Sequence, residues 1–145
     1  MTAVGFGGGG LLFLTISNTF MRPRPFTLFD KMIWSGSPNI PGFPSGHALS
    51  ILACSAFVVY LFLPKIKTKL GKILVVLLAL LLVLYVGFGR LYVGDHYLTD
   101  IIAGYAVGIA WSGLAYTYIE WFFQRYYLRK QKKRLNYEKT KKSFE

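Results

Sequence analysis

Long runs of apolar residues constrain the fold of this 145-residue chain more than any other feature. Three runs are nearly free of charge, at Ala48–Leu63, Ile73–Phe88 and Ile101–Trp121, and a weaker fourth run covers Val4–Met21. A helix needs about 20 apolar residues to cross a bilayer. We therefore expect an all-α fold, an integral membrane bundle of about four transmembrane helices.

Small residues interrupt the last of these runs at regular places. Gly104, Gly108 and Gly113 lie within an otherwise bulky apolar segment. Glycine in a membrane helix allows the backbone of a neighbouring helix to approach closely. These three positions therefore predict a face that packs against another helix rather than against lipid.

Basic residues are concentrated at two places. Of the 17 Lys and Arg residues, nine lie between Arg125 and Lys142, and four flank the short connection at residues 65–72. Cytoplasmic flanks of membrane helices carry such an excess, and 54% hydrophobic residues favour that interpretation over nucleic-acid binding. The chain is thus expected in the cell membrane, with residues 1–123 as its membrane domain and 124–145 as a basic cytoplasmic tail.

Three short polar segments lie between the apolar runs. With the basic tail and the basic connection at residues 65–72 in the cytoplasm, all three segments fall on the extracytoplasmic side. They are Arg22–Pro25, Phe43–His47 and Gly89–Asp100, and they contain both histidines of the chain. Guanidinium groups match phosphate oxygens bidentately. The arginines of these segments therefore indicate a phosphate site, while anchoring to lipid headgroups is the alternative for each arginine alone.

The second segment has the pattern of a helix start. Ser45 is a favoured N-cap, and an apolar run follows it directly. Free backbone N–H groups at such a terminus bind anions, and Gly46 lets a ligand approach the backbone. His47 would then lie in the first turn of the helix. Without a ligand, the same pattern is a capped helix with an interfacial histidine.

The third segment places a histidine four residues before an aspartate, His96 and Asp100. At a helix start, this spacing lets the carboxylate accept a hydrogen bond from one imidazole nitrogen, which leaves the other nitrogen free to attack. The alternative is an aspartate favoured by the helix dipole beside an unrelated histidine. Zinc bound by two histidines and one aspartate is less favoured, because the arginines would repel a cation.

Together, these segments resemble the three signature motifs of the type 2 phosphatidic acid phosphatase (PAP2) family, the lipid phosphate phosphatases. The matching residues are Arg24-Pro25, Pro44-Ser45-Gly46-His47 and the spacing from Arg90 through His96 to Asp100, and the match covers roughly residues 17–108. Two positions depart from the family pattern, Ser17 in place of a lysine and Gly89 in place of a serine. Members usually have six spans, so we expect a minimal or N-terminally truncated member whose catalytic half is present.

The resemblance also implies a role for each motif residue. His96 would be the nucleophile that forms a phosphohistidine, with Asp100 orienting it. His47 would protonate the leaving oxygen and then activate water. The residues expected to bind the phosphate are Arg24, Arg90, Ser45 and Gly46, with Arg22 replacing the charge of the missing lysine. Family members work without metal, so no metal or other cofactor is expected.

The expected function is an integral membrane phosphatase that hydrolyses a lipid phosphate or diphosphate at the extracytoplasmic face. Candidate substrates are undecaprenyl diphosphate, phosphatidate and phosphatidylglycerophosphate, with a polyprenyl diphosphate favoured. Headgroup choice is expected to depend on the loop Phe26–Phe43 and on the packing of the helices. The alternative, motivated by Ser17, is a catalytically weakened protein that binds lipid phosphate or serves assembly. The partners are thus a lipid phosphate and the bilayer, with no nucleic acid, and the oligomeric state is left open.

Overall fold

The computed structural model describes residues 2–28 and 40–142, and this part of the chain is helical without any strand. The all-α prediction is therefore confirmed. Most of the loop between Phe26 and Phe43, which was expected to choose the headgroup, lies outside the described residues. The elements in order are α1 (Thr2–Phe20), η1 (Pro25–Thr27), α2 (Gly46–Phe62), η2 (Leu63–Lys65), α3 (Lys69–Tyr92) and α4 (Leu98–Lys142).

Within the described residues, three helical segments are long and apolar enough to cross a membrane, Gly46–Lys65, Lys69–Tyr92 and Leu98–Tyr137. α1 covers the fourth predicted run. Large apolar side chains are exposed along α3, with Leu78 64% exposed and Leu81 61% exposed. An apolar surface of this extent suits contact with lipid rather than water. The chain is thus a multi-pass membrane protein.

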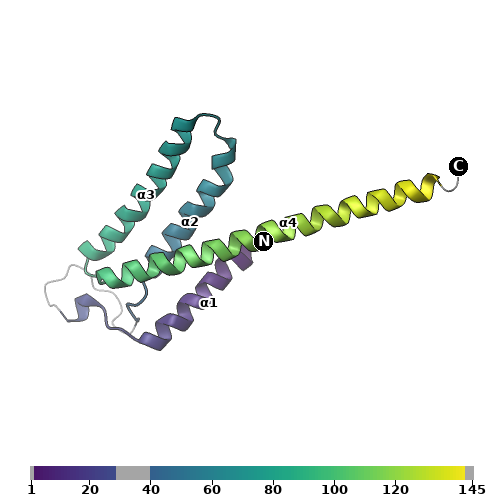
Figure 1. Ribbon diagram of the computed structural model, residues 1–145. Coiled ribbons are helices and arrows are strands. Elements are labelled where there is room, and N and C mark those ends of the chain that lie inside the picture. Colours follow the sequence, from purple (N-terminus) through teal and green to yellow (C-terminus); the bar gives the residue numbers. More distant parts are fainter. Residues whose placement is uncertain (1, 29–39, 143–145) are drawn as a thin grey trace. The chain divides into compact units, whose positions relative to one another are not determined.

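α2 and α3 form a helical hairpin, closed by η2 and a short connection (Figure 1). Each helix begins at a side-chain cap. Ser45 Oγ accepts a hydrogen bond from the Ala48 N–H, and Thr68 Oγ1 accepts one from the Gly71 N–H. Such caps satisfy backbone donors that the first helical turn leaves unpaired. The predicted N-cap at Ser45 is therefore confirmed.

The first half of α4 packs against the start of α2 through glycines. A Cβ atom at Gly104 would lie 2.5 Å from the Ser45 carbonyl oxygen, and one at Gly108 would lie 3.1 Å from the Leu49 carbonyl oxygen. Gly113 has no described atom within 4 Å of such a position. The predicted close packing of helices is thus confirmed at the first two glycines, which belong to the first compact unit described below.

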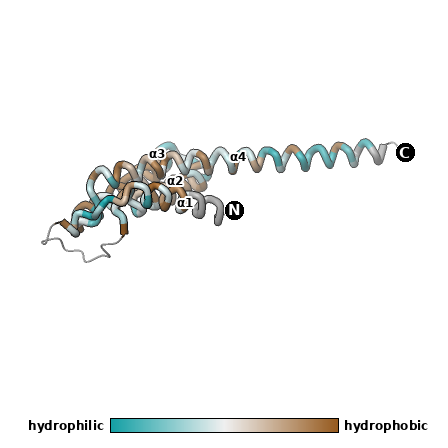
Figure 2. The backbone as a smooth tube through the Cα atoms, turned by 90° about the horizontal axis from the view of Figure 1, so that it is seen from below, coloured by the Kyte–Doolittle hydropathy of each residue, from teal (hydrophilic) through white to brown (hydrophobic). Residues whose placement is uncertain are grey.

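The chain divides into two compact units, Met1–Ser112 and Gly113–Glu145, so the boundary falls inside α4. In the second unit the helix is exposed and increasingly polar, and hydrophilic residues recur along it in Figure 2. Arg125 lies over the Trp121 ring, 4.8 Å from its centroid. Everything that forms the site below belongs to the first unit.

Candidate active site

Three backbone hydrogen bonds join the polar segments at one end of the first unit. The Gly42 N–H donates to the Arg22 carbonyl oxygen at 2.8 Å, and the Phe26 N–H donates to the Gly94 carbonyl oxygen at 3.2 Å. The Ser45 N–H donates to the Asp100 carbonyl oxygen at 2.9 Å. The end of α1, the start of α2 and the α3–α4 turn are thereby held together (Figure 1).

The turn between α3 and α4 has a glycine that fixes its shape. Gly94 adopts φ 77°, a left-handed conformation that favours glycine. Its N–H donates to the Leu91 carbonyl oxygen at 3.0 Å, and the Asp95 N–H donates to the Arg90 carbonyl oxygen at 3.1 Å. This pair of bonds is a Schellman motif, which ends α3. The turn brings Asp95 and the next residue, His96, back beside the end of α3.

The imidazole of His96 is buried and held by a backbone carbonyl. Its Nδ1 lies 2.7 Å from the Gly42 carbonyl oxygen, whereas the nearest Asp100 oxygen is 3.8 Å away. The expected hydrogen bond from His96 to Asp100 is therefore absent, although the two side chains are neighbours. Because a carbonyl oxygen only accepts, Nδ1 carries the proton and Nε2 keeps a free lone pair. Burial lowers the pKa of His96 below 6.5, and the nearby Asp95 carboxylate opposes that shift.

Asp100 is fully buried and makes other contacts, which explains the absent bond. Its Oδ2 accepts the Tyr97 N–H at 2.8 Å, as the acidic residue of a capping box does at a helix start. Its Oδ1 pairs with Arg22 Nη1 at 2.7 Å. The same Nη1 lies 2.6 Å from Thr99 Oγ1, and the Arg22 guanidinium covers the Tyr97 ring. Arg22 therefore contacts the start of α4, whereas the other two arginines contact a different carboxylate.

Two arginines converge on Asp95, a carboxylate that is 2% exposed. Arg24 Nη1 pairs with Asp95 Oδ1, and Arg90 Nη1 lies 3.7 Å from Oδ2. The same Oδ2 is 3.7 Å from His96 Nε2. Arg24 is also held by a second bond, because its Nε donates to the Ile40 carbonyl oxygen at 3.1 Å. The free nitrogen of the predicted nucleophile thus lies beside the carboxylate that the two predicted phosphate-binding arginines contact.

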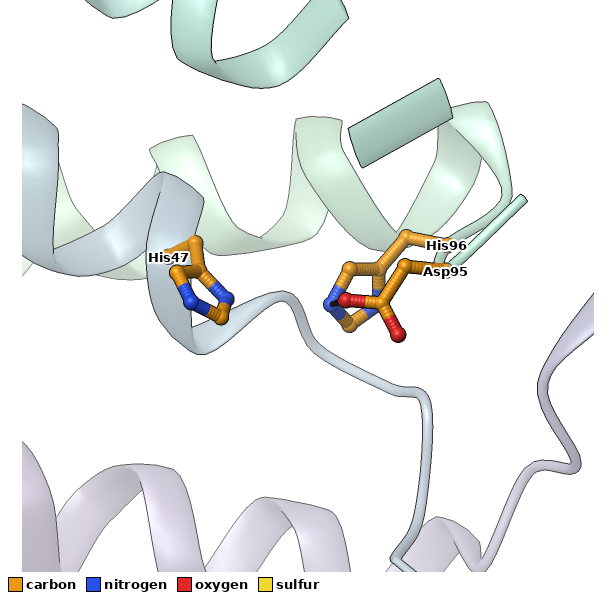
Figure 3. A group of neighbouring side chains, drawn as sticks. All are labelled: His47, Asp95 and His96. Carbon is orange, nitrogen blue, oxygen red and sulfur yellow. Dashed lines mark ion pairs between the residues drawn. The ribbon is translucent and has the colours of Figure 1, made fainter. Parts of the chain in front are cut away.

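His47 reaches the same place from the first turn of α2. Its ring centroid lies 6.5 Å from that of His96, and Figure 3 shows the Asp95 carboxylate beside His96 with His47 facing them. One ligand atom from each of these three side chains lies within 4.8 Å of the others. Two imidazoles and a carboxylate are zinc-type ligands. Here, however, the carboxylate is already paired with one arginine and approached by a second, and both oppose a cation.

The remaining predicted phosphate ligands, Ser45 and Gly46, lie in contacts between helices. Ser45 has no exposed surface, and its Oγ caps α2. A Cβ atom at Gly46 would lie 3.2 Å from the Phe13 ring, so this glycine allows close packing of α1. Ser17, the position where the family pattern has lysine, is 4% exposed within α1.

Two participants were missed from the sequence, Asp95 and the Gly42 carbonyl. Asp95 lies within the segment Gly89–Asp100, but no role was predicted for it. Its place directly before His96 was the available signal, because neighbours of a nucleophile share its surroundings. Gly42 carried no side-chain signal, and it is 54 residues from His96.

Comparison with known proteins shows similarity over nearly the whole chain. The family model described as the PAP2 superfamily matches residues 2–124. The chain is 32% identical over 106 residues to phosphatidylglycerophosphatase B of Bacillus subtilis, covering 72% of this chain and 49% of that protein. It is 35% identical over 98 residues to an undecaprenyl-diphosphatase of Sulfolobus acidocaldarius, covering 67% of this chain and 43% of that protein.

A lipid A 1-phosphatase of Rhizobium johnstonii is 31% identical over 110 residues, covering 72% of this chain and 41% of that protein. Among solved structures, the crystal structure of the transmembrane PAP2 type phosphatidylglycerolphosphate phosphatase from Bacillus subtilis superposes with a TM-score of 0.68 at 25% identity. That likeness covers 81% of this chain and 56% of the other. The chain spans less than half the length of these three curated relatives.

Proposed function

Because this chain belongs to the PAP2 superfamily, we propose that it is a lipid phosphatase with His96 as its nucleophile. The observation that carries the proposal is the position of the His96 Nε2 atom. Nδ1 is bonded to the Gly42 carbonyl, so Nε2 carries the lone pair, and Nε2 lies 3.7 Å from the Asp95 carboxylate that Arg24 and Arg90 contact. A neutral imidazole in this state is an effective nucleophile.

The proposed first step transfers the phosphoryl group to His96. Nε2 forms a bond to phosphorus as the bond from phosphorus to the leaving oxygen breaks. His47, in its protonated form, donates a proton to that oxygen, so the lipid alcohol or the lipid monophosphate leaves with that oxygen protonated. Proton transfer from a positioned histidine contributes about 10²- to 10⁴-fold to such reactions.

The proposed second step releases phosphate. His47 is now neutral and accepts a proton from a water molecule, whose oxygen forms a bond to phosphorus. The bond between phosphorus and Nε2 breaks, which returns the electron pair to His96 and gives inorganic phosphate. Both histidines end in their starting states, so the cycle balances.

Arg24 and Arg90 supply the positive charge that phosphoryl transfer requires. Catalysis of this reaction depends chiefly on positioning and on stabilising charge at the transferring oxygens. Two guanidinium groups meet at the site, and we propose that they serve without a metal ion. Arg22 is proposed to position the start of α4 through Asp100 rather than to contact the phosphate.

A lipid phosphate or diphosphate is the proposed substrate class. The curated relatives bear names that refer to phosphatidylglycerophosphate, lipid A 1-phosphate and undecaprenyl diphosphate, all phosphorylated lipids. His47 lies in the first turn of an apolar helix and His96 just before another, so a lipid tail can stay in the bilayer while its headgroup meets the site. A polyprenyl diphosphate remains the favoured candidate. The basic tail and the connection at residues 65–72 support an extracytoplasmic site with a cytoplasmic tail.

The test is release of phosphate from a panel of monophosphate and diphosphate lipids by the purified protein in detergent. His96→Ala is expected to abolish release, while Lys133→Ala, in the second unit, is expected to keep it. EDTA is expected to have no effect on the wild type. Release that survives His96→Ala would overturn the nucleophile assignment. Binding of lipid phosphate without release from any substrate, in the wild type and in Ser17→Lys, would favour the binding-protein alternative.

A further inference from the structure

The Asp95 carboxylate lies where a transferring phosphoryl group needs to bind. A nucleophile and the atom it attacks must approach to about 3–3.5 Å, and Asp95 Oδ2 is 3.7 Å from His96 Nε2. Guanidinium groups bind phosphate oxygens through the same N–H donors that bind carboxylates. Arg24 and Arg90 direct theirs toward Asp95. One position therefore serves two anions, and a bound phosphoryl group requires the carboxylate to move.

The backbone of Asp95 is fixed, so the movement has to come from its side chain. The Asp95 N–H is bonded within the Schellman motif, and the following residue is held by the Gly42 carbonyl. Among the described residues, the ion pairs of the carboxylate include one close contact, with Arg24, because its distances to Arg90 and His96 are both 3.7 Å. Rotation about the side-chain bonds would break that contact while the turn that holds the Asp95 backbone stays in place.

Arg24 does not depend on Asp95 for its orientation. Its Nε donates to the Ile40 carbonyl oxygen, and a Cβ atom at Gly42 would lie 3.2 Å from the Arg24 Cγ. The arginine is thus held along its length by the segment before α2. Two roles of the Asp95 carboxylate can therefore be distinguished. If the carboxylate competes with phosphate for the guanidinium, its removal strengthens phosphate binding. If it only holds the arginine in place, its removal does not.

Resting on the proposed phosphatase function, we infer that Asp95 is a specificity-determining residue that competes with substrate for the two arginines. An incoming anion must offer the guanidinium groups more charge than the carboxylate it displaces. A phosphomonoester carries about −1.5 to −2 at neutral pH, and a diphosphate ester carries more, whereas a phosphodiester carries only a single charge. Asp95 therefore selects monoesters and diphosphates over phosphodiesters. Asp95 also weakens the binding of inorganic phosphate to the two arginines, and this product must leave after each cycle.

The test compares binding of inorganic phosphate to the wild type, Asp95→Asn and Asp95→Ala by isothermal titration calorimetry in detergent. Loss of a competing charge-assisted contact is expected to tighten the Kd by about tenfold in both variants. Glu120→Gln, which removes an exposed carboxylate of the second unit, is the control for net charge and is expected to match the wild type. Phosphate binding that is unchanged or weaker in folded Asp95→Asn would overturn the inference.

A measurement on the wild type keeps the inference testable if both variants fail to fold. The infrared difference spectrum on adding phosphate is expected to contain a shifted carboxylate band, because Asp95 leaves Arg24; a spectrum without one would overturn the competition. Neither readout needs turnover. If Asp95→Asn binds inorganic phosphate more tightly but the protein hydrolyses no lipid, the competition is supported and the phosphatase function is refuted. If the protein hydrolyses lipid but Asp95→Asn binds phosphate more weakly, the phosphatase function is supported and the competition is refuted.

Discussion

His96 Nδ1 lies 2.7 Å from the carbonyl oxygen of Gly42, a hydrogen bond between residues 54 positions apart. The bond selects the imidazole tautomer that leaves Nε2 without a proton. It does so with a group that does not ionise, whereas an aspartate in the same place would lose its charge in acid. Burial lowers the pKa of His96, while the Asp95 carboxylate and the bond to Gly42 oppose that shift.

We expect His96 to titrate below pH 6.5, because burial lowers its pKa. The neutral form is then favoured by the folded state, so the resulting stabilisation is present above pH 6.5 and is lost as the pH falls. The chain has only two histidines, so NMR titration of the imidazole nitrogens, with His47→Gln to assign the signals, measures the midpoint. In Asp95→Asn the midpoint is expected to move lower still, because the carboxylate raises the pKa of His96. A midpoint above 6.5 in the wild type would contradict the geometry.

His47→Ala is expected to distinguish substrates by their leaving groups. A lipid alcohol needs a proton as it leaves, so release from a lipid monophosphate should fall by about 10²- to 10⁴-fold. p-Nitrophenolate leaves without a proton, so formation of the phosphohistidine from p-nitrophenyl phosphate should be affected far less. Rapid-mixing measurement of the first turnover separates the two steps. Equal losses with both substrates would argue against His47 as the acid.

Arg22→Ala is expected to lower stability more than phosphate binding. Its loss leaves Asp100 buried without its charged partner, and we expect a decrease of about 2 kcal/mol in the free energy of unfolding. Arg24→Ala is the matched comparison: it also leaves a buried carboxylate, Asp95, without its close partner, but it should in addition weaken inorganic phosphate binding. Thermal unfolding and calorimetry on both variants measure the contrast. If Arg22→Ala weakened phosphate binding as strongly as Arg24→Ala, the predicted role of Arg22 as a phosphate ligand would be restored.

Gly104→Ala and Gly113→Ala are expected to have opposite effects. A Cβ atom at Gly104 would lie 2.5 Å from the Ser45 carbonyl oxygen and 2.9 Å from the Ala48 Cβ atom, so the substitution should destabilise by about 1–3 kcal/mol. At Gly113 the space is open among the described residues, and replacing a helical glycine should stabilise by about 0.5–1 kcal/mol. The midpoints of thermal unfolding in detergent give both values. Equal shifts would show that α2 and α4 do not pack closely at Gly104.

Patterns local in the sequence gave correct predictions. The Ser45 cap and the close packing at Gly104 follow from residue type and spacing alone. The pairing of His96 with Asp100 was only partly correct, because spacing made them neighbours but not hydrogen-bond partners. Asp100 accepts the N-cap N–H and Arg22 instead. A residue type does not say which of several nearby donors a carboxylate takes, and a backbone acceptor such as Gly42 leaves no trace in the side-chain pattern.

The three hydrogen bonds that join the polar segments are made by the main chain alone, from Gly42, Phe26 and Ser45. Any residue other than proline donates such a bond, so the alignment of the segments is largely independent of side-chain identity. Substitutions around the site can then accumulate during divergence while the two imidazoles keep their places. A change such as serine for lysine at position 17 alters the charge within α1 without removing any of these three bonds. Members of one family can in this way acquire different lipid preferences while retaining one chemistry.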